Sequence, residues 1–458
     1  MFQHDVTATG FQPEETTIGP DNVGSLEPAW AVPIAGTIES PAVADGGCVF
    51  IGTQSGQVYA LDIADGSLVW DAQLSTATTL SVAGGRVFVQ SGSIVTALNE
   101  STGLIEWQKD FAPYSSIGSP LAAEDWVVFG MSGCSDLGSR PTPCRGYYAL
   151  LDQATGDVVV DGYDVSDDDV ERGMEGPGFW SHPSYDPLQK YVYFGTANVR
   201  SIAPENPHSN ALLKIDVDPN RETYGEVVGY FHSLPSNPIH DYPGGQELCG
   251  PSPASLAIAA VCIDDDDFPT TAVIYDDSHG DRRLGATHSG ADLPLRTFGS
   301  FLVPVGNFFG LDPDTMEPVW SAPTTAARAA VSAYDGERIF YSAGYDGGLI
   351  AVDKDSGAQL WQANTYPVNV WQHVSAANGV VYTPSGAAGV AANAGPGLLM
   401  AFDAETGTTL LERPITLDIG DVATGTISGG VTIARNTVIV PTNGVSNAAY
   451  LVAYRLPA

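Results

Sequence analysis

The cysteines are the residues whose spacing most directly suggests a chemistry. Cys134 and Cys144 lie close together in the sequence, as do Cys249 and Cys262. Each pair could close a short loop as a disulfide in an oxidising compartment, whereas a metal site would need tighter spacing or neighbouring histidines. We therefore expect two disulfides. Cys48 lies in a strand-like apolar run and is expected to be a small buried side chain without a chemical role.

Acidic runs and histidines offer a second, weaker signal for metal binding. The runs 167–169 and 264–267 could collect Ca²⁺, but each lacks the Gly turn and distal Glu of a loop-type calcium site, so solvated loops are expected. Six histidines fall in the middle of the chain and could bind a transition metal, although solvated loop positions are expected for most of them. They are His182, His208, His232, His240, His279 and His288. No Ser/His/Asp arrangement supports a hydrolase.

The elements that must position such groups follow from a repeat. An apolar run leads to an acidic or amide residue, a tight turn that usually contains Gly, and an aromatic or apolar residue eight positions after the acid. Asp62 leads to Trp70, Asn99 to Trp107, Asp312 to Trp320 and Asp353 to Trp361, and weaker copies begin at Asp152, Asp216 and Asp403. Each unit supplies about four short strands and no helical period. We interpret the Trp residues and the turns as packing and turn devices between units.

A sheet of four strands that is apolar on both faces must stack on neighbours, and a ring of such sheets satisfies all of them. Seven copies plus the strands in 434–454 make eight sheets, the last of which lacks one strand. The segment at about 26–32 could supply that strand. The sequence thus predicts an all-β fold: an eight-bladed β-propeller of four-stranded antiparallel blades, as a single domain over 1–458.

Uneven spacing between the repeats marks insertions, which in propellers map to loops on one face. The segments concerned are 130–145, 161–180, 199–210, 232–300 and 384–397, with the largest insertion at about 232–300. We expect the functional face to be built from these segments.

Composition excludes several classes of function. There are 18 Lys plus Arg against 54 Asp plus Glu, and this net charge of -36 would repel nucleic-acid phosphates. No apolar stretch approaches the roughly 20 residues that span a bilayer. The acidic composition and the expected disulfides favour a periplasmic or secreted protein. Because the polar start after Met1 has no apolar signal core, we expect that Met1 replaces a removed signal.

Three segments carry a resemblance to a known family. They are GPGFWS (176–181) continuing through DP (186–187) to YFGTAN (193–198), HDYPG (240–244), and GMSGCSDL (130–137) followed by RGY (145–147). With the opening ETTIGPDNVGSL (15–26), they resemble the quinoprotein alcohol dehydrogenases over nearly the whole chain. These are eight-bladed propellers that carry pyrroloquinoline quinone (PQQ), and the similarity is to their polyvinyl-alcohol-dehydrogenase-like branch.

The resemblance implies a role for each matching residue. Trp180 would stack under the flat quinone, and the amide oxygen of Asn198 would ligate Ca²⁺. Asp136 stands where the family has a Glu ligand, one carbon longer. Asp241 would be the catalytic base and would lie beside the metal. Arg145 is a candidate for cofactor binding.

The implied reaction is oxidation of an alcohol, with a small-molecule, secondary or polymeric substrate all open. Because no Cys-Xaa-Xaa-Cys-His haem motif occurs, electrons would pass to a separate acceptor, such as a cytochrome c or a dye.

Two departures from the family keep an alternative open. Segment 90–95 lacks the vicinal Cys-Cys followed by Arg of many relatives, and 303–308 lacks the expected cation for the PQQ carboxylates. Arg282, Arg283, Arg296 or Arg328 could replace that cation. The alternative is a non-catalytic binding or assembly propeller of the BamB type, in which Trp180 is ordinary packing between blades.

Overall fold

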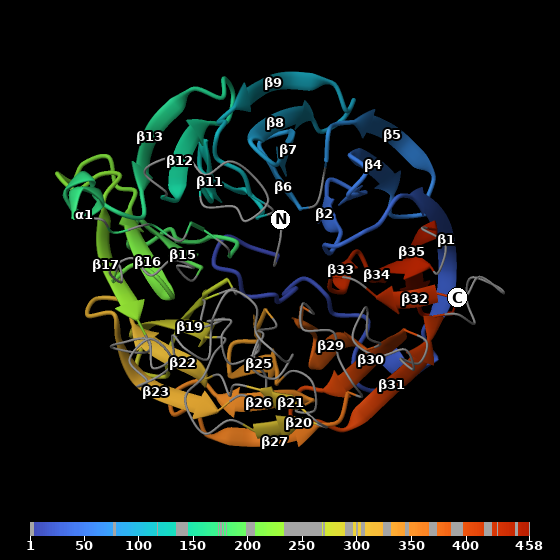
Figure 1. The fold of residues 1–458 in the computed structure, drawn as a ribbon. Coiled ribbons are helices and arrows are strands. Elements are labelled where there is room, and N and C mark those ends of the chain that lie inside the picture. The colour runs from blue at the N-terminus through green and yellow to red at the C-terminus, as the bar shows by residue number, and fades with distance from the viewer. Residues whose placement is uncertain are drawn as a thin grey trace.

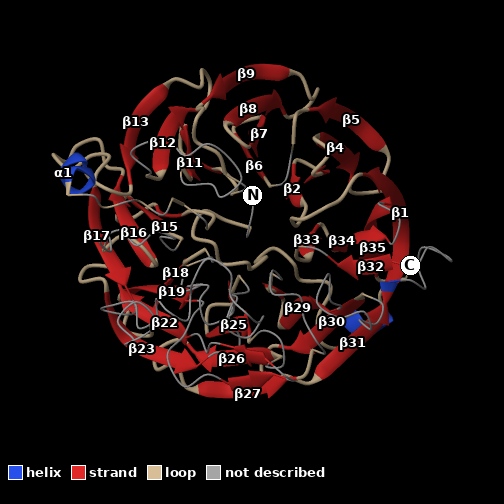
Figure 2. Cartoon of the chain, viewed as in Figure 1, coloured by secondary structure: helices blue, strands red, loops and turns tan. Residues whose placement is uncertain are grey.

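A computed structural model describes residues 4–76, 79–116, 118–133, 145–172, 174, 176, 178–179, 181–197, 207–232, 268, 271–288, 296–298, 301–303, 307–323, 331–343, 348–365, 373–385, 397–415, 424–427, 429–444 and 448–457. Eight antiparallel sheets stand in a ring around a central axis (Figure 1). Strands dominate the ring, and the helices of the described residues are short (Figure 2): α1 (Asp167–Glu171) and the 3-10 helix η1 (Val23–Ser25). The predicted eight-bladed all-β propeller is confirmed.

The blades follow one another in chain order, each from its inner to its outer strand. Blade 1 contains β2 (Val43–Asp45), β3 (Cys48–Gly52), β4 (Gln57–Asp62) and β5 (Leu68–Gln73). Blade 2 contains β6 (Leu80–Ala83), β7 (Arg86–Ser91), β8 (Ile94–Asn99) and β9 (Ile105–Asp110). Blade 3 contains β10 (Leu121–Ala123), β11 (Trp126–Met131), β12 (Tyr147–Asp152) and β13 (Val158–Tyr163). Blade 4 contains β14 (Ser184–Asp186), β15 (Tyr191–Gly195), β16 (Ala211–Asp216) and β17 (Val227–His232).

The second half of the ring repeats this order. Blade 5 contains β18 (Val273–Asp276), β19 (Arg282–His288), β22 (Asn307–Asp312) and β23 (Glu317–Pro323), with the hairpin β20 (Arg296–Phe298) and β21 (Phe301–Val303) between β19 and β22 in sequence. Blade 6 contains β24 (Ala333–Tyr334), β25 (Arg338–Ser342), β26 (Leu349–Asp353) and β27 (Gln359–Ala363). Blade 7 contains β28 (Ser375–Ala377), β29 (Val380–Ser385), β30 (Leu398–Asp403) and β31 (Thr409–Pro414).

Blade 8 joins the two ends of the chain. Its strands are β33 (Thr432–Ala434) and β32 (Thr424–Ile427), which both pair with β34 (Thr437–Gly444), then β35 (Ala448–Arg455) and β1 (Glu27–Ala35). β1 runs antiparallel to β35 from Glu27↔Arg455 to Ala35↔Ala448. The expectation that an N-terminal strand closes the ring is confirmed, and this strand extends three residues beyond the predicted end at about 32. Closure leaves the blade ring without an open end.

At five blade boundaries, a tryptophan on the outer strand of one blade contacts the next blade. Each donates its indole N–H to a backbone carbonyl in the turn between the third and fourth strands of the following blade. The pairs are Trp30 to Ile63 (2.9 Å), Trp70 to Glu100 (2.7 Å), Trp107 to Gln153 (2.8 Å), Trp320 to Lys354 (3.0 Å) and Trp361 to Ala404 (3.0 Å). The glycine of the same turn lies against the indole; a Cβ on Gly103 would stand 2.5 Å from the Trp70 ring. The interpretation of Trp and turn as packing devices therefore holds for these pairs.

The strand pairings define two faces of the ring. In each of the first seven blades, the turns from first to second strand and from third to fourth strand lie on one face, called here the turn face. The opposite face, called the loop face, holds the ends from which the remaining connections leave. All five predicted insertion segments begin and end at the loop face, although 232–300 also contains β18 and β19 of blade 5. The strands thus direct every long segment to the same face.

The N-terminal segment crosses the inner strands of four successive blades. Carbonyls of Val6, Thr7, Thr9 and Gly10 accept the backbone N–H groups of Tyr185, Ile274, Tyr334 and Ala376, at 2.7, 2.9, 2.7 and 2.8 Å. These inner strands are sheet edges, whose N–H groups need partners. The segment therefore satisfies one edge donor in each of blades 4 to 7, and Figure 1 shows it running through the centre of the ring.

Buried side chains form a core between each pair of neighbouring blades. Between blades 3 and 4, Val128 and Leu150 pack with Phe194 and Leu213, all fully buried. No helix of the described residues is long and apolar enough to cross a membrane.

Candidate functional site

Most of the residues predicted for the site lie outside the described residues. They are Asp136, Trp180, Asn198 and Asp241, together with Cys134, Cys144, Cys249 and Cys262. Arg145 is described, and so is Cys48, a free thiol half-buried on β3 whose pKa is raised by burial. The described residues that flank each predicted one therefore define the site.

The backbone places the segments around Trp180 and Asn198 side by side. Phe179 forms an antiparallel bridge with Thr196, and the N–H of Ala197 donates to the carbonyl of Gly178 at 3.1 Å. One step further, the hydroxyl of Ser181 accepts the N–H of Gly195 at 2.7 Å. These contacts extend the inner edge of β15 beyond its end on the loop face. The sequence neighbours of Trp180 and Asn198 are thus held in one short ladder.

The segment that leads to Asp136 reaches the same place. Ser132 exchanges two backbone hydrogen bonds with Ser115, at 2.9 and 3.0 Å. A Cβ added to Gly178 would stand 2.6 Å from both the Cβ and the hydroxyl of Ser132, and Gly178 has a φ of +90°. Only glycine permits this approach and this conformation. Three predicted ligand segments therefore converge at the loop face between blades 3 and 4.

Asp164 is buried at the centre of this convergence. Its Oδ1 accepts the N–H of Gly146 at 2.8 Å, and its Oδ2 accepts the N–H of Gly178 at 2.7 Å. Burial raises the pKa of Asp164 to about 7, against the lowering effect of the two N–H groups and of Arg145. Sequence reasoning missed this residue because it is one acid among many, directly after a strand; only the glycines around it carried a signal.

Arg145 lies toward the outer side of blade 3. Its Nη1 contacts Oδ1 of Asp167 at 2.6 Å, and its guanidinium carbon lies 3.8 Å from the ring centroid of Tyr163, a residue of the outer strand β13. Asp167 is 86% exposed on its side chain, so this ion pair is solvated and weak. Binding a cofactor carboxylate would require Arg145 to exchange this partner, and its role in cofactor binding stays a prediction.

Two histidines, His373 buried and His182 partly exposed, lie near the loop-face ends of inner strands. Nδ1 of His182 accepts the N–H of Ser119 at 2.7 Å, and the backbone of His373 forms an isolated parallel β-bridge with that of Val331. Burial lowers the pKa of both rings to about 3, and for His373 the nearby His182 adds to the lowering. Of the six histidines named in the sequence analysis, His288 is buried at 4% exposure and His279 is exposed, so the expectation of solvated positions for most of them is not contradicted. Among the described residues no group of three or more His, Cys, Asp or Glu is placed to hold a metal ion.

The two departures from the family also have structural counterparts. Gln90, in the segment without the Cys pair, is buried on β7 and donates to the carbonyl of Gly130 at 3.2 Å. Arg282 and Arg283 lie at the turn-face end of β19, where Arg282 binds Asp186 at 2.7 Å. That position removes both arginines from the candidates for a cation at the loop face.

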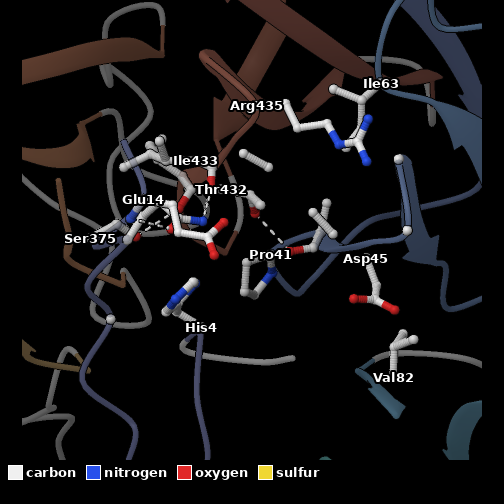
Figure 3. Close-up of a pocket in the computed structure, with 18 of the residues that line it drawn as sticks. His4, Glu14, Pro41, Asp45, Ile63, Val82, Ser375, Thr432, Ile433 and Arg435 are labelled. Atoms are coloured by element: carbon white, nitrogen blue, oxygen red, sulfur yellow. Dashed lines mark hydrogen bonds between the residues drawn. The ribbon is translucent and has the colours of Figure 1, made fainter. Parts of the chain in front are cut away.

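A cavity of about 420 Å³ is lined by the N-terminal segment and by residues of blades 1, 2, 7 and 8 (Figure 3). It is lined by His4 and Glu14 of the N-terminal segment and by Asp45, Thr432 and Arg435 of blades 1 and 8. Arg145 does not line it. This cavity is therefore separate from the convergence between blades 3 and 4.

Comparison with known proteins decides the family. Residues 22–207 and 277–454 match a family model, PQQ_2, described as outer membrane protein assembly factor BamB. The chain belongs to this PQQ-type repeat family. The match begins five residues before β1, ends in β35 and leaves out 208–276, which contains β16, β17 and β18.

This PQQ-type repeat protein is also similar to curated enzymes. It is 24% identical over 293 residues to the quinoprotein ethanol dehydrogenase of Pseudomonas aeruginosa, covering 50% of this chain and 46% of that protein. It is 25% identical over 226 residues to the polyvinylalcohol dehydrogenase of a Sphingopyxis species, covering 43% and 34%. The chain thus spans less than half the length of these relatives. The resemblance inferred from the sequence motifs is confirmed.

Among solved structures, the quinohemoprotein alcohol dehydrogenase from Comamonas testosteroni has the same fold. The TM-score is 0.71 at 14% identity, over 99% of this chain and 80% of that one. At this identity the similarity supports the eight-bladed architecture and nothing finer.

Proposed function

We propose that this protein oxidises an alcohol with PQQ and Ca²⁺ and passes the electrons to a separate acceptor, a cytochrome c or a dye. The observation that carries the proposal is the ladder from Gly178 to Ala197, joined by Ser132, which gathers the segments predicted to bind the cofactor. The relatives named as quinoprotein and polyvinylalcohol dehydrogenases support the same reaction class.

The residues present suit such a cofactor in their chemistry. A hard cation prefers oxygen ligands, and Asn198, Asp136 and Asp241 would supply an amide oxygen and two carboxylates. Trp180 would offer a flat aromatic face. The close approach of Gly178 to Ser132 holds two of the three segments together without any ligand. The fit is least complete for the cofactor carboxylates, because Arg145 is paired with Asp167.

The quinone, once bound beside Ca²⁺, would supply the carbonyl group that accepts hydride from the alcohol carbon. Asp241 would take the proton of the substrate hydroxyl, so that the alcohol leaves as an aldehyde or ketone. Trp180 would fix the plane of the ring, and Asn198 and Asp136 would hold the cation. Small, secondary and polymeric alcohols all remain candidate substrates.

Two further features belong to this proposal. A periplasmic or secreted location suits disulfides between Cys134 and Cys144 and between Cys249 and Cys262. The first of these would close the loop that carries Asp136. The whole of 1–458 would act as one propeller domain, with the connections of 232–300 contributing Asp241.

Reconstitution tests the function. Protein treated with EGTA and then loaded with PQQ and Ca²⁺ should reduce an electron-accepting dye when an alcohol is added. At saturating PQQ and Ca²⁺, Asp241→Asn should lower kcat by about 10²-fold or more, because a general base contributes about 10²–10⁴ to the rate. The matched control is Asp277→Asn, at the turn face. Absence of PQQ uptake by wild-type protein would reject the proposal.

The second candidate is a non-catalytic binding or assembly propeller. It is favoured by the BamB description of the matching family model and by Gln90, a residue of 90–95, which is buried where many relatives carry the Cys pair. It would be supported if the protein took up neither PQQ nor Ca²⁺ but retained a protein partner of defined identity in a pull-down.

A further inference from the structure

Asp164 contacts segments that adjoin all three loops predicted to bind the cofactor. Gly146 follows the loop with Asp136, and Gly178 precedes Trp180. On its backbone side, the carbonyl of Asp164 accepts Nδ1–H of His208 at 2.5 Å, and His208 follows the loop with Asn198. One residue immediately after β13 therefore joins the flanks of three loops that are far apart in the sequence.

The packing around this carboxylate is too close for any side chain in two places. A Cβ on Gly176 would lie 2.0 Å from Oδ1 of Asp164, and a Cβ on Gly146 would lie 2.5 Å from the Cα of Gly178. Side chains at these positions would push the segments apart. The glycines thus bring the two backbones within reach of one carboxylate, and the carboxylate satisfies an N–H group from each.

The position of Asp164 is unsuited to contact with substrate. Its exposed fraction is 0%, and both carboxylate oxygens are already engaged by backbone N–H groups. A buried acid with two structural partners holds its neighbours in place, as the residues behind metal ligands do. Removing it would leave the buried N–H groups of Gly146 and Gly178 without their acceptor, and the two segments that contain them would become less ordered.

We propose that Asp164 is the positioning residue of the cofactor site: by binding Gly146 and Gly178 together it fixes the segments that present Asp136 and Trp180, and so sets the affinity for PQQ without touching it. This inference rests on the proposed function for its ligand. Its structural part, the joining of Gly146 and Gly178 by the Asp164 carboxylate, stands independently of any ligand.

The experiment compares Asp164→Asn with Asp161→Asn. Asp161 is an exposed acid on β13, the strand that precedes Asp164, and it accepts a hydrogen bond from the hydroxyl of Tyr147 at 3.1 Å, so its variant makes the same Asp-to-Asn change without altering the acceptor of the Gly146 and Gly178 N–H groups. Two quantities are measured: the dissociation constant for PQQ at saturating Ca²⁺, from quenching of tryptophan fluorescence, and hydrogen exchange of the peptides covering 145–148 and 174–181 without cofactor.

In Asp164→Asn the amide can accept only one of the two N–H bonds. We expect its dissociation constant for PQQ to rise about 10- to 100-fold, as for other residues that orient ligands, with kcat at saturating PQQ within a few-fold of wild type. Exchange in both peptides should accelerate. Asp161→Asn should match wild type in both measurements. Equal PQQ affinity and equal exchange in Asp164→Asn and wild type would overturn the inference.

Two results separate the possible failures. If wild type and Asp161→Asn bind no PQQ, the proposed function is wrong, and faster exchange in Asp164→Asn would still support the positioning of the segments. If Asp164→Asn does not fold, His208→Ala replaces it, since this change removes the bond to the Asp164 carbonyl, together with the ring contact to Tyr230, and leaves the Asp164 carboxylate in place. A smaller shift in the same direction is then expected, and unchanged exchange around 174–181 would overturn the inference.

Discussion

The indole of Trp107 in blade 2 donates its N–H to the backbone carbonyl of Gln153 in blade 3, at 2.8 Å. The ring also covers Gly156, where a Cβ would come within 2.7 Å of the indole. One hydrogen bond and one close contact therefore join blade 2 to blade 3, which is one of the two blades between which the candidate site lies. The same arrangement recurs at four other boundaries, from Trp30 to Trp361.

Replacing Trp107 by Phe should destabilise the fold by about 1–3 kcal/mol, because a buried carbonyl loses its donor. Gly156→Ala should also destabilise it, since the residue has a φ of +70° and no space for a methyl group. Urea unfolding measures both. Val159→Ala, at an exposed position on β13, is the control and should change the free energy of unfolding by less than about 0.5 kcal/mol. A variant of Trp107 as stable as this control would contradict the expectation.

Asp164 should make stability fall as the pH rises. Its pKa is about 7 in the folded protein and close to 4 in the unfolded chain, so the folded state binds the proton more tightly. The stabilisation is complete below about pH 4 and is lost as the pH rises through about 7. When melting temperature is plotted against pH, the curves of wild type and Asp164→Asn should therefore converge as the pH rises from 4 to 8. Parallel curves would show that Asp164 does not titrate in this range.

His182 and His373 should have the opposite dependence. Their pKa values are lowered to about 3 by burial, so the unfolded chain takes up protons first as the pH falls below about 6.5. Stability should then decrease between pH 6.5 and pH 3. His182→Asn can still accept the N–H of Ser119 and should reduce the slope of unfolding free energy against pH in that window. The exposed His279→Asn is the control, with a slope like that of wild type.

The ion pair of Arg145 with Asp167 gives a direct test of the predicted cofactor contact. Asp167→Asn should leave stability within about 1 kcal/mol, because the pair is solvated. It should tighten PQQ binding a few-fold if Arg145 then pairs with a cofactor carboxylate. Arg145→Gln should weaken binding in the same titration. If both variants bind PQQ like wild type, Arg145 is not a cofactor ligand.

The sequence predicted the architecture well because the information is local and repeated. The interval from Asp62 to Trp70 encodes a turn and an outer strand, and its recurrence encodes the ring. Closure by β1 followed from counting strands. The segments of the site could be placed on one face because antiparallel blades send alternate connections to opposite faces.

The centre of the candidate site was less predictable. Asp164 owes its role to Gly146 and Gly178, which are separated from it by 18 and 14 positions and meet it only in the folded ring. The sequence likewise could not exclude Arg283 as a cation for the cofactor, because the end of β19 on which it lies depends on strand pairing. Long-range neighbours of this kind leave no spacing pattern.

The pairing of β1 with β35 also has a consequence for biosynthesis. β1 is synthesised before all other strands of the ring and β35 after them, so the edge of β1 that pairs with β35 stays unpaired until the other blades have been synthesised. Proline at 28 and at 33 removes two N–H donors from that waiting strand. The nascent chain is thereby less able to pair with a second copy before its own last strand arrives.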